Sequence, residues 1–322
     1  MKRLVAAVVL LALPGVAAAQ DWPTRPVSMV VPFAAGGPVD VGGRIVAQRL
    51  TEVLGRQVVV ENIGGAGGAT GAQRVARSTP DGYQFLLGNI ATHAFNQTLY
   101  KKPLYDAVAD FAPVGLTVEQ PRVLSVRKDL PVNTLPEFIA YAKAHQAELK
   151  FGSAGHGSAA HVACTLLNSR IGVDITHVPY RSTTLAVQDI VAGRVDYICD
   201  VISGMLPFIQ GDQIKPIALL SPRRANVLPQ VATAQEQGFG EFDTSSWHAV
   251  FFPPRTPEPI VRRLNAALSE TLDTPAVRER LESLGATVVA AERRSPDYLA
   301  QHVRREIEKW APAIKATGAS VD

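Results

Sequence analysis

Short apolar runs of strand length alternate with amphipathic stretches of helical length in the first part of this chain. Val27–Val31, Val58–Val60 and Phe85–Leu87 are apolar runs bounded by turn residues, a pattern that favours buried strands. Between them, apolar residues recur at helical spacing over 40–54, and a second helix is predicted through about residue 77. This alternation predicts a parallel sheet with helices packed on its faces.

The alternation breaks near residues 111–127, where two strand-like runs follow one another without a helix between them. A second strand–helix unit follows, and a last long strand at 247–252 leads into a mostly helical C-terminal part. We interpret this as a chain that leaves a first lobe near 120, builds a second lobe and returns, so that two crossover strands form a hinge. The predicted fold is α/β, with one doubly wound lobe from residues 20–122 and 248–322 and another from 123–247.

The first nineteen residues have the pattern of a secretory signal peptide rather than of a short buried helix. Lys2 and Arg3 precede the apolar stretch Leu4–Leu13, and small residues end at Ala19. Such a stretch is too short to span a bilayer, which takes about 20 residues. Cleavage after Ala19 leaves 322 − 19 = 303 residues that start at Gln20, so no lipid anchor is indicated. We expect an exported, periplasmic protein.

The net charge of the chain limits which partners are expected, and its cysteines raise the question of a disulfide. The formal charge of +3 includes Lys2 and Arg3, so the mature chain carries 3 − 2 = +1, and its basic residues are scattered. Nucleic acid is therefore not an expected partner, and a monomer is expected. Cys164 and Cys199, the two cysteines of the chain, are predicted on a helix and a nearby strand of one lobe. They form either one disulfide in an oxidising compartment or two buried free thiols.

Each lobe offers strand–turn–helix junctions that suit an anion, because the free N–H groups of a helix start favour negative charge. In the first lobe the turn is Phe33–Gly37, with Asp40 in the following helical turn. Asp40 either stabilises the helix start or accepts a hydrogen bond from a ligand. Asn89 and Thr92 follow the third strand and either contact a ligand or cap the next helix.

The second lobe holds the densest cluster, the segment Gly152–Ser158, which we call the cradle. Its glycines and serines precede a helix for which Ser158 is well placed as N-cap, with His161 three residues on. Ser182 and Thr183 place further hydroxyls at a helix start, and Asp200 ends a central strand of this lobe. From there Asp200 could face the cleft between the lobes.

Other motifs carry less weight. Gly155-x-Gly157-x-x-Ala160, with Asp174 downstream, matches a dinucleotide-binding fingerprint, but its strand is short. The histidines lack metal-binding spacing, and His156 and His161 are five residues apart, which does not put them on one helical face. No nucleophile is paired with a base in a known catalytic motif. No metal, cofactor or catalytic residue is predicted.

Several blocks of the chain resemble the substrate-binding proteins of tripartite tricarboxylate transporters, often called the Bug family. The resemblance covers nearly the whole mature chain and rests on these segments: 22–40, 60–68, 80–83, 96–100, 105–114, 177–180, and the cradle with His161. It implies a two-lobed periplasmic binding-protein fold and a small carboxylated ligand such as a di- or tricarboxylate, an acidic amino acid or an aromatic acid. The family's ligand-binding positions correspond here to Phe33, Ala35, Gly36, Asp40, Ser153, Ala154, Gly157 and Ser158. Ser182 departs from the family, which usually has glycine there.

These observations predict a non-enzymatic binding protein that captures a carboxylate between its lobes and delivers it to membrane transporter subunits. A periplasmic sensory module for a signalling partner would use the same lobes, and an enzyme that binds a nucleotide at Gly155 is the further alternative.

Overall fold

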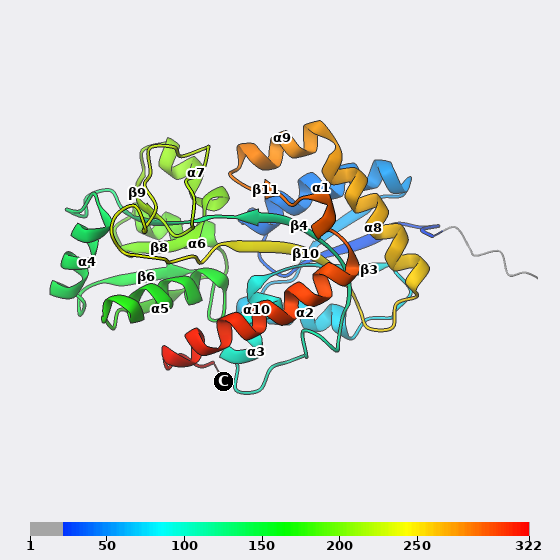
Figure 1. The fold of residues 1–322 in the computed structure, drawn as a ribbon, viewed down its shortest axis with the longest axis horizontal. Helices are drawn as coiled ribbons and strands as arrows, with labels where there is room; N and C mark the ends of the chain where they lie inside the picture. Colours follow the sequence, from blue (N-terminus) through cyan, green and yellow to red (C-terminus); the bar gives the residue numbers. More distant parts are fainter. Residues whose placement is uncertain (1–21, 322) are drawn as a thin grey trace, which may run out of the picture.

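The computed structural model describes residues 22–321, which form two lobes, each around its own sheet (Figure 1). We call lobe 1 the part with strand order β11-β4-β10-β3-β1-β2, and lobe 2 the part with order β7-β6-β8-β5-β9. The two-lobed α/β architecture expected from the sequence is confirmed. The predicted signal peptide lies outside the described residues. Among residues 22–321, no helix is both long and apolar enough to cross a membrane.

Lobe 1 combines the two ends of the described chain. Its strands are β1 (Val27–Val31), β2 (Val58–Asn62), β3 (Gln84–Asn89), β4 (Ala112–Gln120), β10 (Ser246–Phe252) and β11 (Thr287–Val288). Its α-helices are α1 (Pro38–Leu54), α2 (Ala69–Ala76), α3 (Asn96–Leu99), α8 (Glu258–Asp273), α9 (Pro275–Ser283) and α10 (Pro296–Ala316). Short helical turns are η1 (Ala66–Gly68), η2 (Ala91–Phe95) and η3 (Ala291–Arg293).

Lobe 2 is built from the middle of the chain. Its strands are β5 (Arg122–Arg127), β6 (Lys150–Ser153), β7 (Thr176–Pro179), β8 (Tyr197–Val201) and β9 (Ile214–Leu219). Its helices are α4 (Leu135–Ala144), α5 (Ala159–Ile171), α6 (Thr183–Val191) and α7 (Ile202–Gln210). Most boundaries lie within a few residues of those expected from periodicity.

Both sheets are mixed. In lobe 1, β1 pairs in parallel with β2 and β3, as the alternation predicts, whereas β10 is antiparallel to β3 and to β4. In lobe 2, β6 is parallel to β7 and β8, and β5 is antiparallel to β8 and β9. All seven residues of β10 are buried, as expected for a strand in the middle of a covered sheet.

The chain crosses between the lobes along β4 and along the stretch that leads into β10. Figure 1 shows β4 and β10 side by side across the middle of the molecule. Only Pro121 separates β4 from β5, so the first crossing is almost a continuous strand. This arrangement leaves the two lobes facing one another across a hinge.

Local chemistry sets where the helices beside the hinge begin. Pro38 occupies the first turn of α1, where its missing N–H costs no intrahelical bond, and Gly55 ends that helix with a φ of 65°. Gly43 lets α1 lie close to the sheet, because a Cβ there would meet Leu87 Cδ2 at 2.9 Å. In lobe 2, Ser158 and Ser182 cap α5 and α6 through their hydroxyls. The helix starts are therefore firmly placed.

Candidate functional site

A cavity lies between the lobes and is lined by both turns singled out from the sequence. The volume of this cavity, taken as the space open to the centre of a water molecule, is about 40 Å³. Lobe 1 contributes Phe33, Ala34, Gly37, Pro38, Val39, Asn89, Ser246 and His248 to its wall. Lobe 2 contributes Arg122, Ala154, Ser158, Ala159, Ala160, Ser182, Thr183, Asp200 and Val201.

Four helices begin at this cavity. The lining residues include the caps or first residues of α1 (Gly37 to Val39), α5 (Ser158 to Ala160), α6 (Ser182 and Thr183) and α7 (Val201). The first N–H groups of a helix have no acceptor within that helix, and the helix dipole adds partial positive charge there. The four starts together create an environment that favours an anion.

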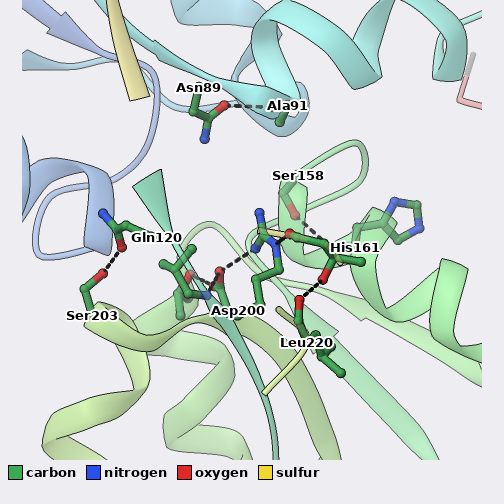
Figure 2. Close-up of polar contacts among 12 residues, drawn as sticks. Asn89, Ala91, Gln120, Ser158, His161, Asp200, Ser203 and Leu220 are labelled. Carbon is green, nitrogen blue, oxygen red and sulfur yellow. Dashed lines mark hydrogen bonds and ion pairs between the residues drawn. The ribbon is translucent and has the colours of Figure 1, made fainter. Parts of the chain in front are cut away.

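Two serine hydroxyls add to these donors. Ser158 Oγ accepts from the backbone N–H of His161 at 3.3 Å, and Ser182 Oγ accepts from the N–H of Leu185 at 3.3 Å. Because a serine hydroxyl that accepts one bond still carries its own proton, each can donate to an oxygen in the cavity. Figure 2 shows Ser158 in this capping position.

A buried ion pair lies at the cavity wall. The Arg122 side chain is 1% exposed; its Nε donates to Thr244 O at 2.7 Å and its Nη1 donates to Asp200 Oδ1 at 3.2 Å. The remaining nitrogen, Nη2, has no hydrogen-bond partner among the described residues. Burial lowers the pKa of Arg122, and the carboxylate of Asp200 opposes that effect. A buried donor without an acceptor costs about 1–3 kcal/mol, so a ligand oxygen at this position would be stabilising.

Asp200 is occupied with its neighbours. In addition to Arg122, it accepts from Thr183 Oγ1 through Oδ2 and from the backbone N–H of Val201 through Oδ1. Asp200 therefore holds the guanidinium and the start of α6 in place, and its oxygens are already paired.

Asn89 faces Ser158 and Asp200 from lobe 1. Its Oδ1 accepts from the N–H groups of Ala91 and Thr92, which leaves the amide nitrogen as its donor. Figure 2 shows that nitrogen directed toward the side of Ser158 and Asp200. The polar groups that face the cavity are thus mostly donors from both lobes.

The lobes touch one another beside the cavity. Thr184 Oγ1 donates to Gly36 O at 3.1 Å, and Ser203 Oγ donates to Gln120 Oε1 at 2.6 Å near the hinge (Figure 2). Tyr100 Oη, which donates to Ala66 O at 2.7 Å, also lies 3.5 Å from His156 O of the cradle. The described conformation is therefore one in which the lobes are closed.

The sequence profile of the tripartite tricarboxylate transporter family receptor, TctC, matches residues 43–319. The chain belongs to this family. The TctC family is one of periplasmic solute-binding proteins, so the resemblance noted from the sequence blocks is confirmed.

Solved structures agree with this assignment. MatC from Rhodopseudomonas palustris, with bound malate, is 41% identical and superposes with a TM-score of 0.89, covering 91% of this chain and all of MatC. The periplasmic binding protein BugD is 37% identical, with a TM-score of 0.89 over 93% of this chain and 99% of BugD. An R. palustris protein with adipate is 34% identical, with a TM-score of 0.88 over 93% of this chain and 99% of that protein.

In this TctC-family chain, part of the predicted site lines the cavity. Those residues are Phe33, Asn89, Ala154, Ser158, Ser182, Thr183 and Asp200. Ala35 and Gly36 are exposed and lie outside the cavity wall, where Ala34 and Gly37 take their place. The turn thus borders the cavity, and its backbone path determines which of its residues face it.

Asp40 supports the turn from behind and is not in the cavity wall. It is 2% exposed and accepts from the N–H of Gly36 at 2.9 Å, from Asn62 Nδ2 at 2.9 Å and from Arg44 Nε at 3.0 Å. Burial raises the pKa of Asp40, but the hydrogen bonds from Arg44, Gly36 and Asn62 outweigh it, so the net pKa is lowered. Of the two alternatives, the structure favours the stabilising one.

Thr92, Ser153 and Gly157 also lie behind the wall. The Thr92 hydroxyl, fully buried, bonds to the backbone of Asn89. Ser153 Oγ bonds within the cradle and to His177. Gly157 meets lobe 1, since a Cβ there would lie 2.9 Å from Tyr100 Oη. These residues shape the site without facing the cavity.

Sequence reasoning missed Arg122, Ser246 and His248. The signal for Arg122 was a single arginine directly before the apolar run Val123–Val126, where an unpaired charge would be costly. His248 is buried in β10, and burial together with the nearby Arg122 charge lowers its pKa to about 4, so its ring is neutral. Ser246 gave no local signal.

Cys164 on α5 and Cys199 on β8 are buried free thiols in the structure. Burial and a hydrogen bond to Cys199 raise the pKa of Cys164 well above its usual value. The two side chains thus lie next to one another, as expected from their elements. Whether the oxidised protein bridges them stays a prediction.

Three histidines gather beside the cradle, although their spacing did not suggest it. They are His156 in the cradle, His161 in the first turn of α5 and His177 on β7. Burial lowers the pKa of His161 to about 4 and that of His177 to about 3, and neighbouring histidines add to both effects. Pairing of β6 with β7, which sets Phe151 opposite His177, brings the third ring to the other two.

Proposed function

We propose that this protein captures a small organic carboxylate between its lobes and delivers it to the membrane subunits of a tripartite transporter, without catalysing a reaction. The observation that carries the proposal is Arg122 Nη2, a buried cationic donor that has no acceptor within residues 22–321, at a cavity where four helices begin. Hydrogen bonds between a cation and a carboxylate are among the strongest in proteins.

The charge balance favours an anion over a neutral or cationic solute. Arg122 and Asp200 cancel as formal charges, so the helix starts and the Ser158 and Ser182 hydroxyls determine the polarity that a ligand meets. Short dicarboxylates are the first compounds to consider, because the structures of two relatives, at 41% and 34% identity, hold malate and adipate. A second carboxylate could use the donors of lobe 1 while the first meets Arg122.

Capture would follow from a shift between open and closed lobes. A ligand that contacts donors of both lobes binds the closed form better and thereby raises its population. The closed surface would then be what the transporter subunits recognise. The remaining features of this proposal are export to the periplasm with cleavage after Ala19, and action as a monomer.

The test is a calorimetric screen of the purified chain against malate, succinate, adipate, citrate, aspartate and benzoate, with succinamide as the uncharged control. At least one acid should bind with one site per chain, and succinamide should not bind. No heat and no thermal shift from any acid would overturn the proposal.

The double variant Arg122→Met, Asp200→Asn tests whether Arg122 binds the acid. Both charges of the buried pair are removed together, so no unpaired charge is left behind, and the variant should fold. Loss of a charge-assisted hydrogen bond worth about 1.5–3 kcal/mol should weaken binding of the acid about 10- to 150-fold. Unchanged affinity would show that Arg122 does not contact the ligand.

A further inference from the structure

We propose that lobe 2 carries a separate binding site for a divalent transition-metal ion, formed by His156, His161 and His177. One ring nitrogen from each of the three lies within 4.8 Å of those of the other two. This site is distinct from the carboxylate cavity, whose wall contains none of these side chains. The proposal does not depend on the function proposed above.

The three rings come from different elements and are packed against one another. The ring centroids of His161 and His177 are 4.1 Å apart, and that of His156 is 4.8 Å from His177 and 5.6 Å from His161. Phe151 stacks on the His177 ring at 4.8 Å. His156 is exposed whereas His161 is buried, so an ion can enter from solvent on the His156 side.

Hydrogen bonds around His177 leave one of its nitrogens ready to bind a metal. Ser153 Oγ lies 2.6 Å from His177 Nε2 and hydrogen-bonds to it. Nε2 is therefore engaged, whereas Nδ1 is buried without a partner among the described residues and remains available to a metal ion. In metal-binding histidines the second ring nitrogen is commonly held by a hydrogen bond in this way.

The donor set indicates which ions fit. Three imidazole nitrogens suit Zn²⁺, Ni²⁺ or Cu²⁺, whereas Mg²⁺ and Ca²⁺ prefer oxygen ligands. Zinc–nitrogen bonds of about 2.0–2.1 Å require donor nitrogens about 3.3 Å apart. The three nitrogens lie within 4.8 Å of one another, so their separations must shorten by up to about 1.5 Å. His156 is free to swing because it is exposed, and the 3.3 Å contact of His161 Nδ1 with the N–H of Gly157 is long enough to yield. The fourth position would be left to water.

The experiment uses the untagged mature chain after removal of metals with a chelator. Titration with ZnCl₂ alone in a calorimeter should give one site per chain, and MgCl₂ should give none. Replacement with Co²⁺ should produce visible absorption bands of a tetrahedral nitrogen-containing site. No zinc binding, or no such bands, would overturn the proposal.

Variants locate the site. His156→Gln and His177→Gln should each weaken zinc binding by about tenfold or more. The matched control is His145→Gln, which removes a partly exposed histidine, at the end of α4, outside the trio. Equal zinc affinity in His156→Gln and His145→Gln would also overturn the proposal, and because His156 is exposed, its replacement should leave the fold intact.

Discussion

Gly67 of lobe 1 lies directly against the backbone of the cradle. A Cβ on Gly67 would lie 2.4 Å from Gly157 C, 2.5 Å from His156 O and 2.6 Å from Ser158 N. Ordinary contact begins near 3.4 Å, so closure would have to stop about 3.4 − 2.4 = 1.0 Å short. Because all three atoms belong to the backbone, no side-chain rotation can relieve the contact. Gly67→Ala should therefore oppose closure of the lobes.

Gly67→Ala should destabilise the open and closed conformations by different amounts. The steric overlap should destabilise only the closed conformation, by about 1–3 kcal/mol, which corresponds to about 5- to 150-fold weaker binding of the organic acid. Gly67 also has a φ of 60°, and alanine in this left-handed conformation costs about 1–2 kcal/mol. That second cost is borne by the open and closed forms alike, so it lowers the melting temperature without changing the affinity.

Gly55→Ala is the matched control. Gly55 ends α1 with a φ of 65°, and a Cβ there would meet no atom of the described part of the chain within 4 Å. Both variants should lose similar stability in denaturant unfolding, but only Gly67→Ala should bind the acid more weakly in calorimetry. Small-angle scattering with saturating acid should show a larger radius of gyration for Gly67→Ala than for Gly55→Ala. Equal affinities for the two variants would refute the reasoning.

Three further predictions concern stability and redox state. Burial lowers the pKa of His93 to about 3 from 6.5, so below pH 6.5 the unfolded chain binds a proton that the folded one does not. The free energy of unfolding should therefore fall by up to about 1.4 kcal/mol for each pH unit below 6.5 because of this residue. His93→Phe keeps the stacking on Phe251 and should reduce the pH dependence of the free energy of unfolding, measured in urea between pH 6.5 and 4. An unchanged pH dependence would contradict this. Asp40→Asn should lower the free energy of unfolding by about 1–3 kcal/mol in the same assay, and a stability equal to wild type would show that the Gly36 turn does not need the carboxylate. Cys164 and Cys199 should both react with a thiol reagent in denaturant without prior reduction, and silence until reductant is added would instead reveal a disulfide.

The sequence was sufficient for features that depend on local chemistry. Ser158 and Ser182 cap the helices expected of them, because a capping serine acts on residues within its own turn. The turns of both lobes and the order of strands and helices are local in the same sense. The family resemblance then placed the lobes opposite one another.

The features that the sequence did not reveal depend on strand pairing between distant residues. Arg122 meets Asp200 because β5 pairs with β8, which sets Val123 opposite Asp200. His177 reaches His161 only because β7 pairs with β6. Spacing along the chain carries no information on such registers, so neither the ion pair nor the group of three histidines could be derived before the fold was known.

The position of β10 has a consequence for how the protein folds. It lies between β3 and β4, so the sheet of lobe 1 cannot be completed until residues 246–252 are present. Lobe 2 draws its five strands from one continuous stretch, 122–219, and can assemble earlier. Until then β3 and β4 keep unpaired edges, which are prone to wrong pairing. The last quarter of the chain thus completes the lobe that the first third began. A C-terminal truncation before 246 should leave a folded lobe 2 attached to an unfinished, aggregation-prone lobe 1.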